Sequence, residues 1–74
     1  MYAMTELNLY LRRKSINKAE ISRKTGISAS RLSELTLKEG SHLRAKELYL
    51  IALAMDVDPC DLLKAVFKGV ELPL

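Results

Sequence analysis

The stretch KAEISRKTGISASRLSELTL, residues 18–37, decides the fold because it places two short helical patterns on either side of one turn signal. Gly26 can adopt the left-handed conformation that ends a helix, and Ser28 can cap the next helix with its hydroxyl. Ser22 is the small residue that two closely crossing helices require. The apolar residues for their inner faces are Ile21, Ile27, Leu32 and Leu35. The stretch therefore predicts two helices that meet at a steep angle around a tight turn.

The residues before this stretch predict one further helix. It is expected to begin after Thr5, whose hydroxyl can cap free amides, and to continue to about Lys14 with apolar residues three and four apart. At the start of the next helix, Asn17 and Glu20 have the spacing at which each side chain bonds the other residue's backbone amide. No stretch alternates with a period of two over the length of a strand, so we expect an all-α fold.

Two more helices are predicted after the stretch, which makes five in all. The fourth is expected to begin near Leu43, and because residues 48–55 are apolar on nearly all sides, it should be the central, most buried helix. Asp56 can end it in the left-handed conformation. The start and stop signals of the last helix are Asp58, Pro59, Asp61 and Gly69. We expect a single domain over residues 1–74, with the last helix and an apolar tail at 59–74.

The size and composition of the chain exclude several classes of protein. A domain of 74 residues has to be stabilised by packing, because one cysteine cannot form an internal disulfide. Cys60 and His42 together fall short of a zinc site, so no metal and no other cofactor is expected. The longest apolar run, residues 48–55, is far shorter than the roughly 20 residues of a membrane span, and no signal peptide is evident. We therefore expect a cytoplasmic protein without membrane contact.

The net charge of +3 is unevenly distributed along the chain. Residues 1–46 hold ten Lys and Arg against four Glu, which gives +6, whereas residues 47–74 hold two Lys against five Asp and Glu, which gives −3. Such an imbalance fits a face that binds a polyanion, and it equally fits an ordinary solvated surface. Charge alone leaves both interpretations open.

The spacing in residues 18–37 resembles a DNA-binding helix-turn-helix, and the following LYLIALAMDVDPCDLL extends the resemblance. From about Leu7 to Leu63 the chain is similar to the phage-repressor and Cro-like family, also called the xenobiotic-response-element family. The resemblance implies a compact five-helix, lambda-repressor-like domain that binds double-stranded DNA. It also implies that the second helix lies across the DNA backbone while the third, at about Ser28 to Thr36, enters the major groove.

The resemblance further implies which side chains contact DNA. The positions at base edges are Ala29, Ser30, Arg31, Ser33 and Glu34, among which Arg31 offers a bidentate contact to guanine. The positions at phosphates are Lys18, Ser28, Lys38, Ser41, His42 and Arg44. The alternative is that residues 28–34 form an ordinary polar helix face. The chain departs from the family at Leu11 and Thr36, where many members have an arginine and a glutamate that pair; because both partners are replaced, we expect the fold to survive.

The end of the chain has more apolar residues than a small domain can easily bury. We expect a homodimer interface there, formed by Val66, Phe67, Val70, Leu72 and Leu74, because such domains bind paired half-sites about 34 Å apart. The alternative is that Val66 and Phe67 close the core while the tail packs back or frays.

These observations favour a sequence-specific transcription regulator, acting as a repressor. The alternative is a protein-interaction module, such as an antitoxin or accessory factor, that binds a partner through its apolar C-terminal segment. An enzyme is not expected, since the sequence contains no nucleophile with a base, no carboxylate pair and no glycine-rich phosphate loop. No binding site for a small-molecule ligand is evident either.

Overall fold

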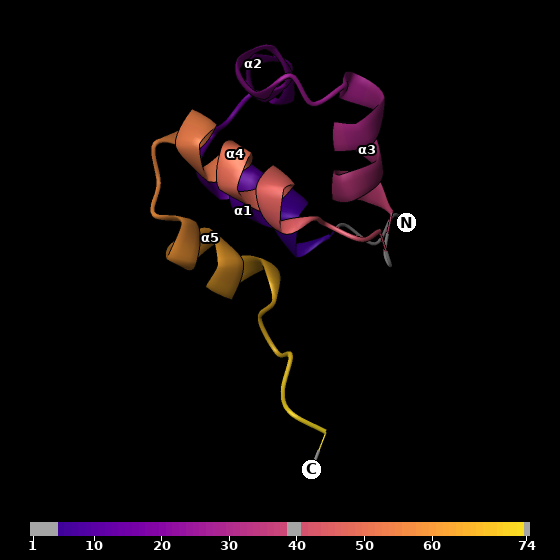
Figure 1. The fold of residues 1–74 in the computed structure, drawn as a ribbon, viewed down its shortest axis with the longest axis vertical. Helices are drawn as coiled ribbons and strands as arrows, with labels where there is room; N and C mark the ends of the chain where they lie inside the picture. Colours follow the sequence, from indigo (N-terminus) through magenta and orange to yellow (C-terminus); the bar gives the residue numbers. More distant parts are fainter. Residues whose placement is uncertain (1–4, 39–40, 74) are drawn as a thin grey trace.

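The structure, a computed structural model, describes residues 5–38 and 41–73, which form five α-helices and no strand (Figure 1). The helices are α1 (Glu6–Arg13), α2 (Lys18–Thr25), α3 (Ala29–Leu37), α4 (Ala45–Met55) and α5 (Pro59–Val66). Helix α1 packs on α3 and α5, while α2 packs on α3 and α4, and α4 also packs on α5. The predicted all-α, five-helix fold is confirmed.

A single apolar core lies between the helices, and each of them contributes to it. Helix α3 gives only a narrow edge, which consists of Leu32, Leu35 and the polar Thr36. The buried apolar residues are Leu7, Tyr10, Leu11, Ile21, Leu32, Leu35, Leu48, Ile51, Ala52, Met55 and Leu62. The inner positions expected of the α2–α3 pair thus lie in or against the core, with Ile27 partly buried at its edge.

The turn between α2 and α3 has the predicted geometry. Gly26 has a φ of 79° and donates its N–H to the carbonyl of Ser22, which ends α2 in the left-handed conformation. The Ser22 hydroxyl donates to the carbonyl of Ile27 at 2.7 Å, so the small residue also fixes the far side of the turn. Ser28 then caps α3 by accepting from the N–H of Arg31. These bonds set the direction in which α3 leaves α2.

One detail of the predicted helix starts was wrong. Asn17 caps α2 through the N–H of Ala19, but Glu20 does not return the bond to Asn17; its carboxylate pairs with Arg23 one turn along the exposed face. Helix α4 begins at Ala45, two residues from the predicted start near Leu43, and Leu43 itself packs against the core.

Helix α4 is buried along one face only, so the expectation that it is the central, most buried helix was wrong. Its buried residues are Leu48, Ile51, Ala52 and Met55. On the other side, Tyr49 and Leu53 are both more than half exposed, with relative exposures of 53% and 57%. Asp56 ends the helix in the left-handed conformation, as predicted.

The chain after α5 leaves the body of the protein. Helix α5 ends at Val66, and Gly69, with a φ of 89°, lies three residues beyond the helix end. Residues 70–73 then extend away from the helices (Figure 1). Val70 and Leu72 are 72% and 80% exposed, so this tail presents apolar side chains to solvent.

Replacing Gly26 tests whether the turn stabilises the fold through its backbone. A Cβ at this position would meet no atom within 4 Å, so the cost of Gly26→Ala is conformational rather than steric. We expect a loss of about 1 kcal/mol in the free energy of unfolding, measured with urea. Gly26→Asn should lose less, because Asn tolerates the left-handed region better. Equal losses for both variants would contradict this explanation.

Candidate nucleic-acid interface

The outer face of α3 is polar and exposed along its first two turns. Ala29, Ser30, Ser33 and Glu34 are all exposed, whereas Leu32 and Leu35 face the core. Because residues three and four apart share a helix face, the exposed residues form one continuous surface. The structure thus brings together four of the five side chains that the sequence assigned to base edges.

Polar bonds hold the carboxyl end of α3. The Thr5 hydroxyl, which caps α1, lies 3.0 Å from the carbonyl oxygens of both Leu35 and Thr36. The Ser41 hydroxyl donates to the carbonyl of Glu34 at 2.9 Å. The carbonyls of Glu34 and Thr36 also accept from the backbone N–H groups of Lys38 and Thr5, so side-chain and backbone donors together bind this end of the helix. The sequence predicted Thr5 as the cap of α1 but not this second role.

At position 36, where many members of the family have a glutamate, this chain has the buried hydroxyl of Thr36. It is completely buried and donates to the carbonyl of Leu32 at 2.8 Å. The ammonium of Lys18, at the start of α2, donates to the Thr36 hydroxyl oxygen at 3.3 Å. Leu11 is buried in the core, so neither position that departs from the family contains an uncompensated charge. Lys18 remains a candidate for a phosphate contact, and in this structure it also joins α2 to α3.

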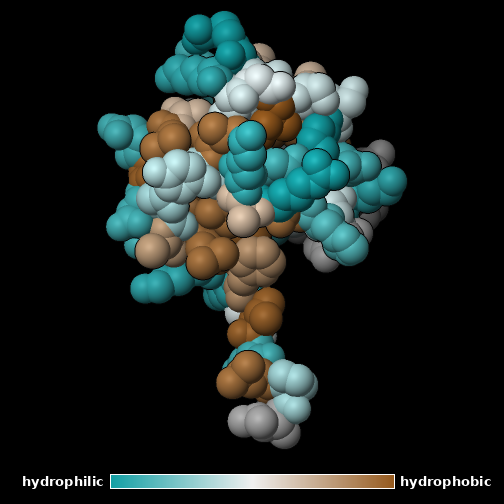
Figure 2. Space-filling view, in the orientation of Figure 1, coloured by the Kyte–Doolittle hydropathy of each residue, from teal (hydrophilic) through white to brown (hydrophobic). Residues whose placement is uncertain are grey.

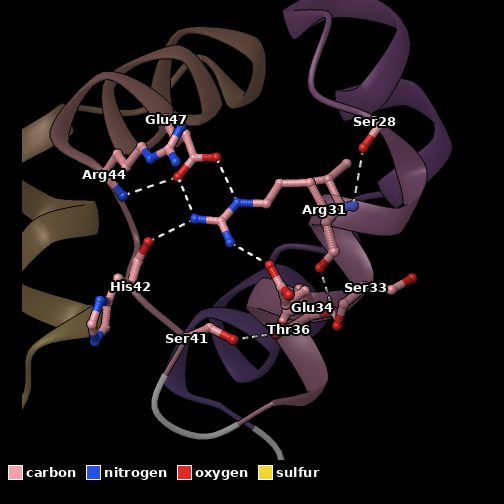
Figure 3. Close-up of polar contacts among 10 residues, drawn as sticks. Ser28, Arg31, Ser33, Glu34, Thr36, Ser41, His42, Arg44 and Glu47 are labelled. Atoms are coloured by element: carbon pink, nitrogen blue, oxygen red, sulfur yellow. Dashed lines mark hydrogen bonds and ion pairs between the residues drawn. The ribbon is translucent and has the colours of Figure 1, made fainter.

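The side chain of Arg31 points from α3 toward α4 (Figure 3). Its Nε donates to Oε2 of Glu47 at 2.8 Å, and its Nη2 donates to Oε1 of the same carboxylate at 2.9 Å. Nη2 also donates to the carbonyl of His42 at 2.6 Å, and Nη1 pairs with Glu34. The Arg31 and Glu47 side chains are only 25% and 13% exposed. The structure therefore places Arg31 in an intramolecular network rather than on the exposed surface with Ala29 and Ser30.

The sequence did not predict the contact of Glu47 with Arg31, although the place of Glu47 near the start of a helix indicates a structural role. Glu47 lies in the first turn of α4, where acidic residues stabilise the helix, and its Oε1 accepts from the backbone N–H of Arg44 at 3.0 Å. The hydrogen bond from Arg31 lowers the pKa of Glu47 below its ordinary value, and the bond from Arg44 acts in the same direction. The hydrogen bonds to Glu47 and Glu34 raise the pKa of Arg31. Both groups stay charged at neutral pH.

The predicted phosphate contacts lie at the two ends of α3 and at the start of α2. Ser28 precedes the first turn of α3, where free N–H groups favour an anion. Lys38, His42 and Arg44 follow α3 and are exposed, while Ser41 is half-buried against it. These phosphate contacts stay predictions. Within residues 5–38 and 41–73, no group of three possible metal ligands is present.

An exposed polar helix fixed on a small all-α body, beside a tight turn and a second helix, defines a helix-turn-helix DNA-binding protein. The chain belongs to the family of Cro/C1-type HTH DNA-binding domains, whose sequence model matches residues 6–68. This confirms the resemblance to Cro-like regulators, which are not enzymes. No curated protein and no solved structure gives a significant match. None of the helices within residues 5–38 and 41–73 meets the length and hydropathy that a membrane span requires.

The lowered pKa of Glu47 predicts a pH dependence of stability. A carboxyl group whose pKa is lower in the folded state stabilises the fold above its unfolded value, near 4.5, and loses this contribution as the pH falls through the folded value. We expect the unfolding free energy of the wild type to fall more steeply below about pH 4.5 than that of Glu47→Gln.

Urea unfolding between pH 3 and pH 7 measures this difference. The matched control is Glu20→Gln, which removes the carboxylate of an exposed pair with Arg23 and should retain the wild-type dependence. Parallel curves for the wild type and Glu47→Gln would contradict the assignment.

Proposed function

We propose that the protein is a repressor-like, sequence-specific regulator that inserts α3 into the major groove of operator DNA as a homodimer. The observation that supports this most directly is the exposed face of α3, which is polar, continuous and held at both helix ends. A helix of nine residues with one buried edge is long enough to present its first two turns to base edges.

The exposed residues of α3 suit different bases. The methyl group of Ala29 fits the methyl of thymine, while Ser30 and Ser33 can bond either donors or acceptors. Glu34, whose side chain is 42% exposed, can accept from the exocyclic amine of cytosine. None of these contacts is a bidentate pair, so we propose that each base is discriminated modestly and that two copies together give the specificity.

The proposed phosphate contacts surround this face. Ser28 and the N–H groups of the first turn of α3 suit one phosphate, and Lys18 suits a neighbouring one. Lys38, Ser41, His42 and Arg44 provide further donors from the segment after α3. Because each neutralised phosphate releases counterions, the logarithm of the binding constant should fall linearly with the logarithm of salt concentration.

Selection from a random duplex library at two salt concentrations tests the proposal. We expect one enriched motif and weaker binding at higher salt, as counterion release requires. Failure of the folded wild type to enrich any motif at low salt would contradict it.

Ser28→Asp and Ser28→Ala form a matched pair for the same experiment. Aspartate keeps the helix cap, so stability should hold, but its charge should repel the phosphate and abolish binding. Alanine should cost about 1 kcal/mol of stability and weaken binding less. Unchanged affinity in Ser28→Asp would show that this end of α3 does not face DNA.

The proposed homodimer uses an apolar groove between α4 and α5. The groove has a volume of about 370 Å³ and is lined by Leu43, Ala45, Leu48, Tyr49, Pro59, Cys60, Leu63 and Phe67. Figure 2 shows apolar side chains over the body of the protein and along the tail beneath it. We propose that Val70 and Leu72 of each copy lie in the groove of the other, with Val66 and Phe67 beside them; Leu74 lies outside the described residues. Exchange of this kind is self-complementary, as a two-fold interface requires.

Sedimentation equilibrium of the double variant Val70→Ser, Leu72→Ser tests the interface. We expect its dimer dissociation constant to rise at least about tenfold, which corresponds to about 1.4 kcal/mol. Leu9→Ser is the control, because Leu9 is 40% exposed and does not line the groove. A wild type that stays monomeric and still binds a palindromic motif would contradict the dimer.

The same groove supports the second candidate, a module that binds another protein. In that case the partner would occupy the apolar surface over Tyr49 and Leu63, and the outer face of α3 would not be needed. Ser30→Ala and Ser33→Ala would then leave function intact. If these variants instead change the enriched DNA motif, the regulator is the correct assignment.

A further inference from the structure

We propose that Arg31 is a positioning residue that fastens α3 to α4 and to the intervening loop, and that it does not contact a base. This inference rests on the proposed function, because it assigns α3 as the helix that contacts DNA. It changes which residues determine specificity, since Arg31 was the one side chain expected to form a bidentate bond to guanine.

The hydrogen-bonding edges of the Arg31 guanidinium are already occupied. A bidentate contact needs two N–H groups on one edge of the planar group. The edge formed by Nε and Nη2 is bound to both carboxylate oxygens of Glu47. On the edge formed by Nη1 and Nη2, Nη1 pairs with Glu34 and Nη2 also donates to the carbonyl of His42. To bind guanine, Arg31 would have to break charge-assisted bonds on one of these edges.

Breaking these bonds would also leave a carboxylate without its partner. The Glu47 side chain is only 13% exposed, and besides Arg31 its bonding partner is the N–H of Arg44. Removing one member of a poorly solvated ion pair leaves an uncompensated charge, which costs more than the pair contributes when intact. A guanine contact would therefore be offset by the loss at Glu47.

The Arg31 bonds connect α3 to α4, two helices that are not among the main packing pairs of the fold. Helix α3 packs on α1 and α2, whereas α4 packs on α2 and α5. Arg31 joins α3 directly to the first turn of α4 through Glu47, and to the loop through the carbonyl of His42 (Figure 3). It thereby fixes the distance between the exposed face of α3 and the loop donors proposed to contact phosphate.

Arg31 also compensates negative charge beside the proposed interface. Glu34 and Glu47 carry carboxylates on either side of its guanidinium. Without Arg31, both carboxylates would repel approaching phosphates across a short distance. Loss of Arg31 should therefore weaken binding to all DNA sequences, whereas loss of a base contact should change the preferred sequence.

A double-mutant cycle of Arg31→Met and Glu47→Gln tests the inference in both stability and DNA affinity. Each single variant should unfold at lower urea concentration than the wild type, and each should bind the enriched motif several-fold more weakly. The double variant should be no worse than Arg31→Met, because Glu47→Gln removes the uncompensated carboxylate. Strictly additive losses in stability, or stronger DNA binding by Glu47→Gln, would overturn the proposal.

The matched control is the same cycle on Arg23 and Glu20, an ion pair on α2 whose side chains are 69% and 52% exposed. Exposed pairs contribute little, so Arg23→Met and Glu20→Gln should show almost no coupling in stability. Coupling of equal size in the two cycles would overturn the proposal, because it would reflect surface charge in general.

Library selection with Arg31→Met separates positioning from base contact. We expect the same ranked motif as the wild type with uniformly lower affinity; loss of a guanine preference at one position would overturn the inference. If the wild type enriches no motif, the proposed function fails, and the stability cycle alone then decides whether Arg31 fastens α3 to α4.

Discussion

Helix α3 has to leave most of its surface free and still be held in one orientation, and the rest of the structure depends on how this is achieved. Its packing edge consists of three buried residues, so apolar contact alone provides little resistance to rotation. Hydrogen bonds from side chains provide further resistance to rotation. Thr5 and Ser41 bind the last carbonyls of α3, and Arg31 joins the middle of α3 to α4. Hydrogen bonds are directional, so they determine the orientation of a helix more strictly than an apolar contact does.

The distribution of charge acquires a structural explanation from this arrangement. The basic excess of residues 1–46 falls on the chain that forms α1, α2, α3, the segment before α4 and the first two residues of α4. Among its cations, Lys18 and Arg31 form bonds between helices: Lys18 joins α2 to α3, and Arg31 joins α3 to α4. Because the donors of Arg31 are occupied within the fold, a count of charges overstates the number of cations available to DNA.

The sequence predicted the helices and their caps well because these depend on neighbouring residues. Gly26, Asp56 and Ser28 act within one turn of their own positions, and the structure places each in its predicted role. The contacts of Arg31 could not be predicted in this way, since Glu47 is sixteen residues away and depends on how α4 is placed. The exposed side of α4 was likewise missed, because an apolar run does not indicate which of its faces will find a partner.

The bonds of Thr5 have a consequence for the order in which the chain can assemble. They join residues that are 30 and 31 positions apart, so α1, α2 and the turn must all be in place before the end of α3 is fixed. Contacts of such separation are delayed by the entropy of closing a long loop, whereas the turns around Gly26 form locally. Helix α3 therefore acquires its final geometry together with the whole domain, and a chain shortened at its beginning to remove Thr5 would still form helices but would hold α3 less firmly.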